Sequence, residues 1–356
     1  MINHLSNLKI DVLVNSHGPH EQVRIREPFC GLQRLGVDCK LNRYPFLLQK
    51  TIRQNSLVIW QRPRPTSWEE QLYIIRFIRS RDSILLVEWD DHPKLFPKEI
   101  RKALSEISMA PLKICHALHT SSELLAASLK VIQPNSFIFP NAIWRIPELN
   151  LEKHLERGKK IRIFVGNQNR ISEHKQISSQ LKEWCEEDPQ IQVIVIGDLA
   201  LASSLPKESI EQHPLLPYLN YRAVMRSCHI ALLPLEDTLA NNCKTEIKWM
   251  EASAESLASV GGPGLYREAF NDNKNGLFCS TLDELIPKAK FLKENILNRI
   301  KLVKAAHKSV TKNLNLRNQL PARIRLYEEI WDSREKLDQT LVNRFPEILS
   351  NRETKL

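Results

Sequence analysis

The sequence predicts an α/β protein built from two doubly wound parallel-sheet domains. Three observations support this fold class. Short apolar runs typical of buried strands alternate with helix-like segments of about ten residues. A polar passage interrupts this alternation once, and the same alternation then starts again. With 356 residues, the chain is long enough for two independent cores.

The first half of the chain carries the first series of strands and helices. Its strand-like runs are rich in Val, Ile and Leu, whereas its helix-like segments repeat apolar residues every three or four positions. We expect strands at 9–14, 56–60, 84–88, 114–118 and 136–139. We expect helices at 24–35, 68–78 and 121–129. Because strands alternate with helices, the sheet is predicted to be parallel and covered on both faces, in a first domain at 1–150.

The second half repeats this pattern after a polar link at 142–160, which contains Pro147. The expected strands are 161–165, 192–196 and 230–233, with a short closing segment at 276–278. The expected helices are 176–184, 219–227 and 245–254, and the second domain is assigned to 151–320. Doubly wound folds bind ligands beyond the carboxyl ends of their strands, so polar residues that follow the strands are the candidate functional residues.

Composition and cysteine usage limit the classes of function. Hydrophobic content of 42% and charged content of 26% are ordinary for a soluble globular protein. No run of about 18 apolar residues predicts a membrane-spanning helix, and the N-terminus lacks a signal-peptide pattern. The seven cysteines are scattered without a CxxC pair. They predict reduced thiols in a cytoplasmic protein rather than a disulfide framework or a zinc site.

The net charge of +10 is concentrated in the first half of the chain. Residues 1–160 hold 24 Lys and Arg against 16 Asp and Glu, whereas residues 161–356 hold 27 against 25. A basic surplus fits an anionic partner, such as a lipid phosphate, a membrane surface or nucleic acid, and also fits a solvated surface without a partner. No RGG tract, RNP-like motif or zinc finger is present, so no nucleic-acid partner is predicted.

Three charged residues, Lys244, Lys248 and Glu251, follow the apolar run at 230–235. Their spacing predicts that they share one side of the expected helix. A strand followed by an open helix N-terminus can hold phosphate, to which two ammonium groups add charge, and a carboxylate can accept hydrogen bonds from ribose hydroxyls. The same spacing also fits a plain surface helix with a Lys–Glu pair worth about 0.3–0.5 kcal/mol.

The wider segment 232–278 resembles the donor-nucleotide segment of GT-B fold glycosyltransferases of the group 1, family 4-like branch. The matching positions keep the family's order and spacing: Pro234, Leu235, Asp237, Thr238, Asn242, Lys244, Lys248, Glu251, Ser259, Gly262, Tyr266, Arg267, Glu268, Asn275 and Gly276. Two positions depart, since Cys243 stands where many relatives have Glu, and Ala254-Glu255 stand where Gly is usual. These departures favour one alternative, a catalytically impaired nucleotide-sugar-binding protein. A nucleotide-sugar epimerase of the same fold, which would need no acceptor, is a second alternative.

The resemblance implies two Rossmann-like domains facing across a cleft, and transfer of a sugar from a nucleotide-sugar donor to an unidentified acceptor with retention. The implied donor-binding residues, all in the second domain, are Lys244, Lys248, Glu251, Arg170, Gly166 and Tyr266. Lys244 would neutralise phosphate and Glu251 would hold ribose, and the implied catalytic residues are Glu251, Lys244 and His17. No cofactor and no metal are implied, because Lys, Arg and helix ends neutralise the diphosphate.

The loops that follow the first-half strands supply the implied acceptor side. Its residues are His17, Gly18, Arg24, Arg62, Asp90 and Asp91. The first three resemble the family's first loop and helix, Arg62 its QRP element, and the two aspartates its acidic element. A histidine there could bond a sugar hydroxyl or a leaving phosphate, or lie in solvent. The aspartates could contact an acceptor hydroxyl, cap turns and pair with Arg62 or Arg64, or bind a metal.

The C-terminal part is predicted to be helical at 282–310 and 323–341, with a disordered tail in the segment 321–356. In the resembling family a terminal helix crosses back onto the first domain, and packing wholly on the second domain is the alternative. The predicted acceptor on the first domain is anionic, lipid-linked or a glycan. The basic surplus adds the expectation of peripheral contact at the inner membrane surface.

Overall fold

The computed structural model describes residues 8–156, 158–166, 170–271 and 273–350. The chain forms two compact units, Met1–Asn141 with Arg317–Leu356, and Ala142–Leu316, which we call the first unit and the second unit. The boundaries lie after 141 and 316 rather than after 150 and 320. The reason is local: Asn141 bonds to Arg24 of the first unit, whereas Ile143 pairs with Asn315 of the second.

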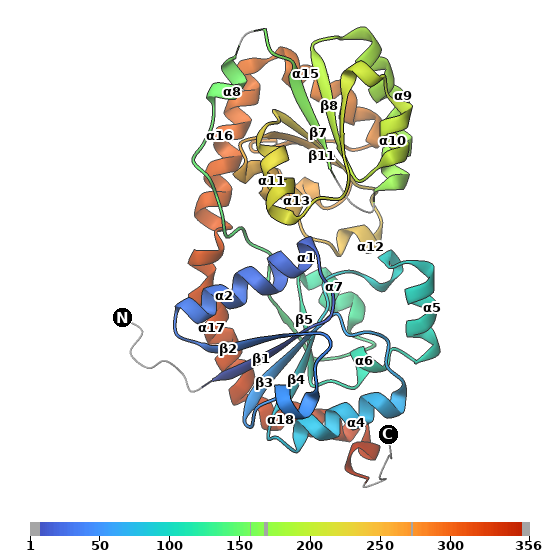
Figure 1. Ribbon diagram of the computed structural model, residues 1–356, viewed down its shortest axis with the longest axis vertical. Coiled ribbons are helices and arrows are strands. Elements are labelled where there is room, and N and C mark those ends of the chain that lie inside the picture. Colours follow the sequence, from blue (N-terminus) through green and yellow to red (C-terminus); the bar gives the residue numbers. More distant parts are fainter. Residues whose placement is uncertain (1–7, 157, 167–169, 272, 351–356) are drawn as a thin grey trace. The chain divides into compact units, whose positions relative to one another are not determined.

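A six-stranded parallel sheet with strand order β2-β1-β3-β4-β5-β6 forms the centre of the first unit, and helices flank it (Figure 1). The strands are β1 Lys9–Val14, β2 Asp38–Arg43, β3 Ser56–Gln61, β4 Ile84–Glu88, β5 Ala117–Thr120 and β6 Ser136–Ile138. The helices of its N-terminal part are α1 Pro19–Glu21, η1 Gln22–Arg26, α2 Glu27–Arg34, α3 Leu48–Thr51, α4 Trp68–Arg79, η2 Pro93–Leu95, α5 Lys98–Glu106, α6 Ala110–Lys113 and α7 Glu123–Leu129. The predicted parallel sheet is confirmed, and β3 and β4 are buried at every position, as their apolar runs indicate.

Strand β2 was not predicted from the sequence. It lies at the edge of the sheet, and its polar sequence DCKLNR leaves Asp38, Lys40 and Arg43 exposed. An edge strand that buries few side chains lacks the continuous apolar run by which central parallel strands are recognised.

A second six-stranded parallel sheet, with order β12-β11-β10-β7-β8-β9, forms the centre of the second unit (Figure 1). The strands are β7 Ile161–Val165, β8 Ile191–Ile196, β9 Ile210–His213, β10 Ile230–Pro234, β11 Ala258–Gly262 and β12 Leu277–Phe278. The helices are α8 Glu152–Leu155, α9 Ile171–Glu187, α10 Leu199–Ser204, η3 Lys207–Ser209, α11 Tyr218–Arg226, α12 Leu239–Asn242, α13 Ile247–Ala254, α14 Tyr266–Ala269, η4 Leu282–Glu284, α15 Leu285–Glu294 and α16 Ile296–Asn313. Strands β9 and β11 were not predicted, because β9 is short and polar and β11 consists mainly of small residues.

The C-terminal helices complete the first unit rather than the second. They are α17 Leu316–Asp332, α18 Arg334–Arg344 and η5 Pro346–Leu349. Tyr327 of α17 stacks on Phe139 with a ring-centroid distance of 4.6 Å. Asp338 of α18 accepts a hydrogen bond of 2.6 Å from Arg79 Nε and lies 3.2 Å from His116 Nε2. Of the two placements considered for this segment, the structure therefore shows packing on the first unit.

Candidate active site

Gly166 directly follows β7 at the carboxyl edge of the second sheet. A Cβ atom at this position would come within 2.2 Å of the Phe164 ring. Only glycine fits this turn, so the backbone there carries no side chain that could block an approaching group.

Lys244 and Lys248 do not share a helix, which corrects the prediction made from their spacing. Helix α12 ends at Asn242, and α13 begins only at Ile247. In the turn between them, Lys244 N–H donates to the Asn241 carbonyl at 3.1 Å. The spacing rule for residues on one helical face applies only within a continuous helix, so it does not place these two ammonium groups together.

Lys248 forms an ion pair with Glu251 inside the second unit. Its Nζ donates to Glu251 Oε2 at 2.9 Å and to Tyr221 Oη at 3.3 Å, and lies 4.7 Å from the centroid of the Tyr221 ring. The Glu251 side chain is only 1% exposed, whereas that of Lys248 is 23% exposed. Glu251 is therefore buried and paired with Lys248, and differs in this from the open carboxylate that the ribose role implies.

The charges of Arg170 and Lys248 both act on Tyr266. Burial raises the pKa of Tyr266 to about 12, and these two charges oppose the shift. Arg170 is 7% exposed and lies 3.9 Å from the carboxylate of Glu173. Of the predicted donor-binding residues, Lys248 and Glu251 are the pair that the structure joins by a direct contact among those described above.

Glu255, which stands where relatives have Gly, forms a second charged cluster. Its carboxylate lies 2.7 Å from Arg222 Nη2 and accepts from Arg226 Nε at 2.6 Å. The left-handed position after α13 is taken instead by Ser256, with φ of 61°. Glu255 therefore links the end of α13 to α11 through its ion pairs with Arg222 and Arg226. Arg222 and Arg226 were not predicted as a charged cluster, although their four-residue spacing on a predicted helix was an available signal.

Cys243, the other departing position, is completely buried. Its side chain is part of the interior of the second unit. All seven cysteines lie in the described part of the chain and are free thiols there.

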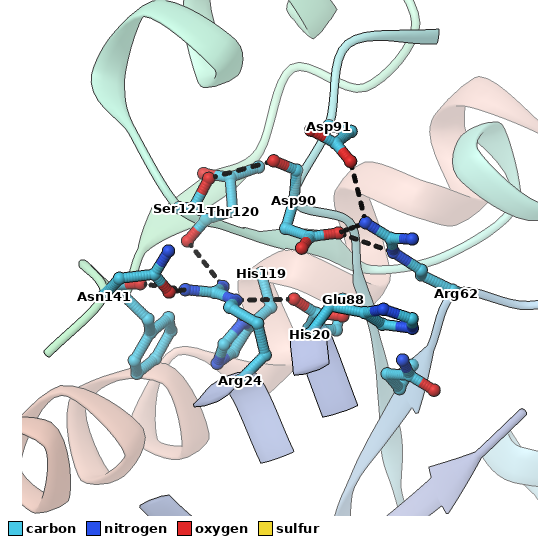
Figure 2. A network of polar contacts seen from close by, with 12 residues as sticks. His20, Arg24, Arg62, Glu88, Asp90, Asp91, His119, Thr120, Ser121 and Asn141 are labelled. Atoms are coloured by element: carbon cyan, nitrogen blue, oxygen red, sulfur yellow. Dashed lines mark hydrogen bonds and ion pairs between the residues drawn. The ribbon is translucent and has the colours of Figure 1, made fainter. Parts of the chain in front are cut away.

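Arg24 is the centre of a buried polar network in the first unit (Figure 2). All five of its N–H groups have acceptors at the ends of β4, β5 and β6. The acceptors are Glu88 Oε1 (2.8 Å), His119 Nδ1 (3.2 Å), Thr120 O (3.1 Å), Asn141 Oδ1 (3.2 Å) and Phe139 O. Arg24 was predicted on the acceptor side, but no N–H group is left for a ligand. It positions the strand ends instead.

The network continues from Arg24 to the C-terminal segment. Because His119 Nδ1 accepts from Arg24, the ring proton is on Nε2, which donates to Tyr327 Oη at 2.9 Å. Burial, together with the charges of Arg24 and Arg323, lowers the pKa of His119 well below its usual value, so the ring is neutral. The imidazole also stacks on Phe139 at a centroid distance of 3.9 Å. The sequence analysis missed the roles of His119 and Tyr327, which are separated by 208 positions.

Arg62 pairs with both aspartates that follow β4 (Figure 2). Its Nε donates to Asp90 Oδ1 at 2.6 Å and its Nη2 to Asp91 Oδ2 at 2.9 Å. Arg62 has a φ of 40°, in the left-handed region that costs a non-glycine residue on the order of 1 kcal/mol. Its backbone N–H is held by the Glu88 carbonyl at 3.0 Å. The pairing predicted for the aspartates is confirmed, and it orients Arg62 along the sheet edge.

Glu88 and Asp90 are two neighbouring carboxyl groups with different protonation behaviour. Glu88 Oε1 accepts from Arg24, whereas the buried Oε2 has no hydrogen-bond partner. Burial and the charge of Asp90 raise the pKa of Glu88 to about 7, against the attraction of Arg24. Burial also opposes ionisation of Asp90, but Arg62 and Arg24 outweigh it and lower the Asp90 pKa. Such divergence between adjacent carboxyl groups is typical of functional sites.

His20, rather than His17, faces this group of charges. His17 was predicted to be catalytic, but its side chain is 59% exposed and its nearest charged partner is Glu21 at 3.4 Å. His20 Nε2 lies 2.7 Å from Ser16 Oγ. Burial and the charge of Arg62 lower the pKa of His20. Gly18, with φ of 135°, makes the bend between the two histidines.

Within the described residues, no group of three or more His, Cys, Asp or Glu side chains is arranged to hold a metal ion. In the same part of the chain, every helix is too short or too polar to cross a lipid bilayer.

Comparison with known proteins defines the fold. No protein-family model and no curated protein sequence matches the chain. Several solved structures do match the chain. A glycosyltransferase from Rickettsia africae is 14% identical, with a TM-score of 0.62 over 91% of this chain and 99% of its own. Sucrose-phosphate synthase from Thermosynechococcus elongatus is 10% identical, with a TM-score of 0.64 over 91% and 100%. Anabaena HepE in complex with UDP and glucose is 11% identical, with a TM-score of 0.61 over 90% and 99%. The resemblance to GT-B glycosyltransferases is thereby confirmed at the level of the fold.

Proposed function

We propose that this protein is a glycosyltransferase that moves a sugar from a nucleotide-sugar donor to a hydroxyl-bearing acceptor. The observation that carries the proposal is the cluster of Lys248, Glu251 and Tyr221 in the second unit, in which Lys248 Nζ donates to Glu251 Oε2 at 2.9 Å and to Tyr221 Oη at 3.3 Å. A cation, a carboxylate and an aromatic hydroxyl in one place can bind a diphosphate, a ribose and a sugar. The HepE structure holds UDP and glucose, which supports a donor of this class.

The donor diphosphate is assigned to Arg170, Lys244 and Lys248. Lys244 lies in the turn that precedes α13, and Lys248 is the second residue of that helix. The ribose contact proposed for Glu251 requires Lys248 and the groups that bury this carboxylate to move, because Glu251 is 1% exposed and its Oε2 is bonded to Lys248. Lys248 can do so on binding by exchanging the carboxylate for a phosphate oxygen.

The proposed chemistry is electrostatic stabilisation of a leaving nucleoside diphosphate. The bond between the anomeric carbon and the phosphate oxygen breaks, and the acceptor oxygen bonds to the same carbon from the same face. The acceptor proton passes to the departing phosphate. Fixed cations aimed at the charge that develops on the leaving group can supply several kcal/mol of transition-state stabilisation. Neither a metal ion nor a cofactor is assigned a role.

The acceptor is assigned to the first unit, at His20, Arg62 and Asp90, with His20 replacing the exposed His17. The net charge of the sequence favours an anionic acceptor and contact with anionic membranes. The structure gives these two expectations less support, because the arginines concerned are already paired. Four arginines follow the ends of strands or lie in the first helical segment of this unit, and each is paired with a carboxylate. The pairs are Arg24–Glu88, Arg26–Glu21, Arg62–Asp90 and Arg64–Glu70.

Thermal unfolding in the presence of UDP-, GDP-, ADP- and CMP-sugars tests the proposal. Ligand at 100 times its dissociation constant adds about 2.7 kcal/mol to the free energy of unfolding, which raises the melting temperature measurably. The stabilising donor is then supplied with radiolabel in the sugar, and release and transfer are measured with and without EDTA. We expect stabilisation by one nucleotide class and activity that survives EDTA.

Lack of stabilisation by every donor would contradict the proposal. Stabilisation without release or transfer would favour the impaired nucleotide-sugar-binding alternative. Loss of transfer on chelation that Mg2+ restores would contradict the metal-independent chemistry.

A further inference from the structure

We propose that the first unit binds an uncharged apolar or aromatic group of the acceptor in a pocket beside Arg62. The inference deepens the proposed function, on which it rests, by naming the class of acceptor. The pocket has a volume of about 400 Å3, which is the size of a site for a small organic molecule. Its walls come from the loops after β1, β2, β3 and β4 and from helix α5, and they are Asn15, Ser16, Tyr44, Arg62, Pro63, Arg64, Pro65, Trp89, Phe96, Ile100 and Leu104.

The walls are mainly apolar and partly aromatic. Trp89 and Phe96 stack with a ring-centroid distance of 5.0 Å. Tyr44 and Ile100 are 50% and 37% exposed, so two large apolar side chains of the wall face solvent. Burial of apolar ligand surface against such walls contributes roughly 25 cal/mol per Å2. A free oligosaccharide, with hydroxyls all around it, would leave many of them without partners there.

The two cations of the wall are already neutralised. Arg62 donates to Asp90 and Asp91, and its guanidinium carbon lies 5.4 Å from the centroid of the Phe96 ring. Arg64 donates to Glu70 at 3.0 Å. An anionic ligand would have to compete with these carboxylates, whereas an uncharged ligand leaves the pairs intact.

Two residues of the wall carry a buried polar atom without a hydrogen-bond partner, Asn15 Oδ1 and Trp89 Nε1. Buried polar atoms normally have partners, so each unpaired one needs an explanation. Because both atoms are buried, a ligand reaches them only when the side chains of the wall move on binding. A ligand hydroxyl could then donate to the Asn15 oxygen and accept from the Trp89 ring N–H, so we include one hydroxyl in the proposed apolar group.

Arg62 connects this pocket to the acceptor side of the proposed reaction. It belongs to the pocket wall and to the ion pair with Asp90 at the carboxyl edge of the sheet. An acceptor held by its apolar group in the pocket would thus be anchored next to the residues assigned to the acceptor hydroxyl.

The test uses N-phenyl-1-naphthylamine, an uncharged dye whose fluorescence rises in apolar surroundings. We expect saturable binding to the wild-type protein, and at least tenfold weaker binding to Ile100→Trp, which fills the pocket from its exposed side. Val131→Trp, at a 97% exposed position of the same unit outside the pocket, is the matched control and should bind the dye like the wild type. The concentration of competitor that displaces half of the dye is then measured with the wild-type protein for 2-naphthol, 2-naphthyl phosphate and maltose. The same concentration is measured for 2-naphthol and naphthalene with the wild type and with Asn15→Leu.

We expect 2-naphthol to displace the dye at concentrations no higher than 2-naphthyl phosphate, and maltose to have no effect. In the wild type we expect 2-naphthol to displace the dye at a lower concentration than naphthalene. Asn15→Leu should reduce the ratio of these two concentrations at least threefold. The inference is overturned by non-saturable dye binding, by unchanged binding in Ile100→Trp, or by displacement that is tenfold stronger with the phosphate or equal with maltose. None of these measurements needs a donor. If dye binding fails while UDP-sugars still raise the melting temperature, the acceptor inference fails and the proposed donor function stands.

Discussion

The charged candidate residues of the two units differ in their balance. In the first unit, three carboxylates, Glu88, Asp90 and Asp91, surround two arginines, Arg24 and Arg62. In the second unit, the candidate cations Arg170, Lys244 and Lys248 accompany one candidate carboxylate, Glu251. The net charge of the units runs the other way, with 27 basic and 20 acidic residues in the first unit against 24 and 21 in the second.

This difference shows that the net charge of a sequence region does not predict the charge at its site. The first unit has the larger basic surplus, although its candidate site holds three carboxylates beside two arginines. We therefore expect substitutions of the charged candidate residues in the first unit to change the stability of the protein. Substitutions of those in the second unit should change donor binding. The following predictions test this contrast, from the largest expected effect to the smallest.

Replacing Arg24 with Met should strongly destabilise the protein. The change leaves Glu88 buried without its cation and removes five hydrogen bonds, so we expect a loss of about 3–5 kcal/mol in the free energy of unfolding. Urea denaturation measures it. Arg26→Met, whose side chain is 48% exposed, should change stability by no more than about 0.5 kcal/mol. Equal, small losses in the two variants would contradict a structural role for the Arg24 network.

Replacing Glu88 with Gln should change how stability depends on pH. The pKa of Glu88 is raised to about 7 from 4.5, so the folded state binds its proton more tightly than the unfolded state does. This contribution to stability is fully present below pH 4.5 and is lost as pH rises to 7. Gln cannot ionise, so the difference in unfolding free energy, variant minus wild type, should rise by about 3 kcal/mol between pH 4.5 and 8. A difference that stays constant over this range would show that Glu88 titrates normally.

Replacing Lys244 with Ala should weaken donor binding and leave the fold intact. Loss of a charge-assisted phosphate contact is expected to cost about 1.5–3 kcal/mol of binding free energy. Calorimetric titration with the stabilising nucleotide measures it, and Lys304→Ala, an exposed lysine on α16, is the matched control. If both variants bind the donor like the wild type, Lys244 does not contact phosphate.

Replacing Glu251 with Gln should reduce affinity for the nucleotide more than affinity for the sugar 1-phosphate, by about 1 kcal/mol, because only the nucleotide offers ribose hydroxyls. The single variant Lys248→Met and the double variant with both changes complete a double-mutant cycle of donor-binding free energies. The pair lies 2.9 Å apart, so the two changes should be non-additive. Equal losses for both ligands would assign Glu251 to the sugar pocket or to a structural role.

The fold could be predicted from the sequence because its central strands are continuous apolar runs, such as those of β4 and β8. Edge elements such as β2, and the small-residue strand β11, bury too few large side chains to be recognised. The site was harder to predict. Arg24 lies 64 positions from Glu88 and 117 from Asn141, and no local pattern encodes such contacts. The Lys244–Lys248 error arose because the spacing of charges does not show where a helix begins.

The C-terminal helices give the chain an order of assembly during its synthesis. The second unit is continuous in sequence and can fold as soon as Leu316 has left the ribosome. The N-terminal part of the first unit is synthesised before the second unit, but Tyr327 and Asp338 are synthesised after it. The hydrogen-bond partners of His119 and His116 are therefore absent until the C-terminal helices have been made. The order of completion is therefore the reverse of the usual N-terminal-first order of domain folding, and the nascent first unit is the part that would need protection by a chaperone.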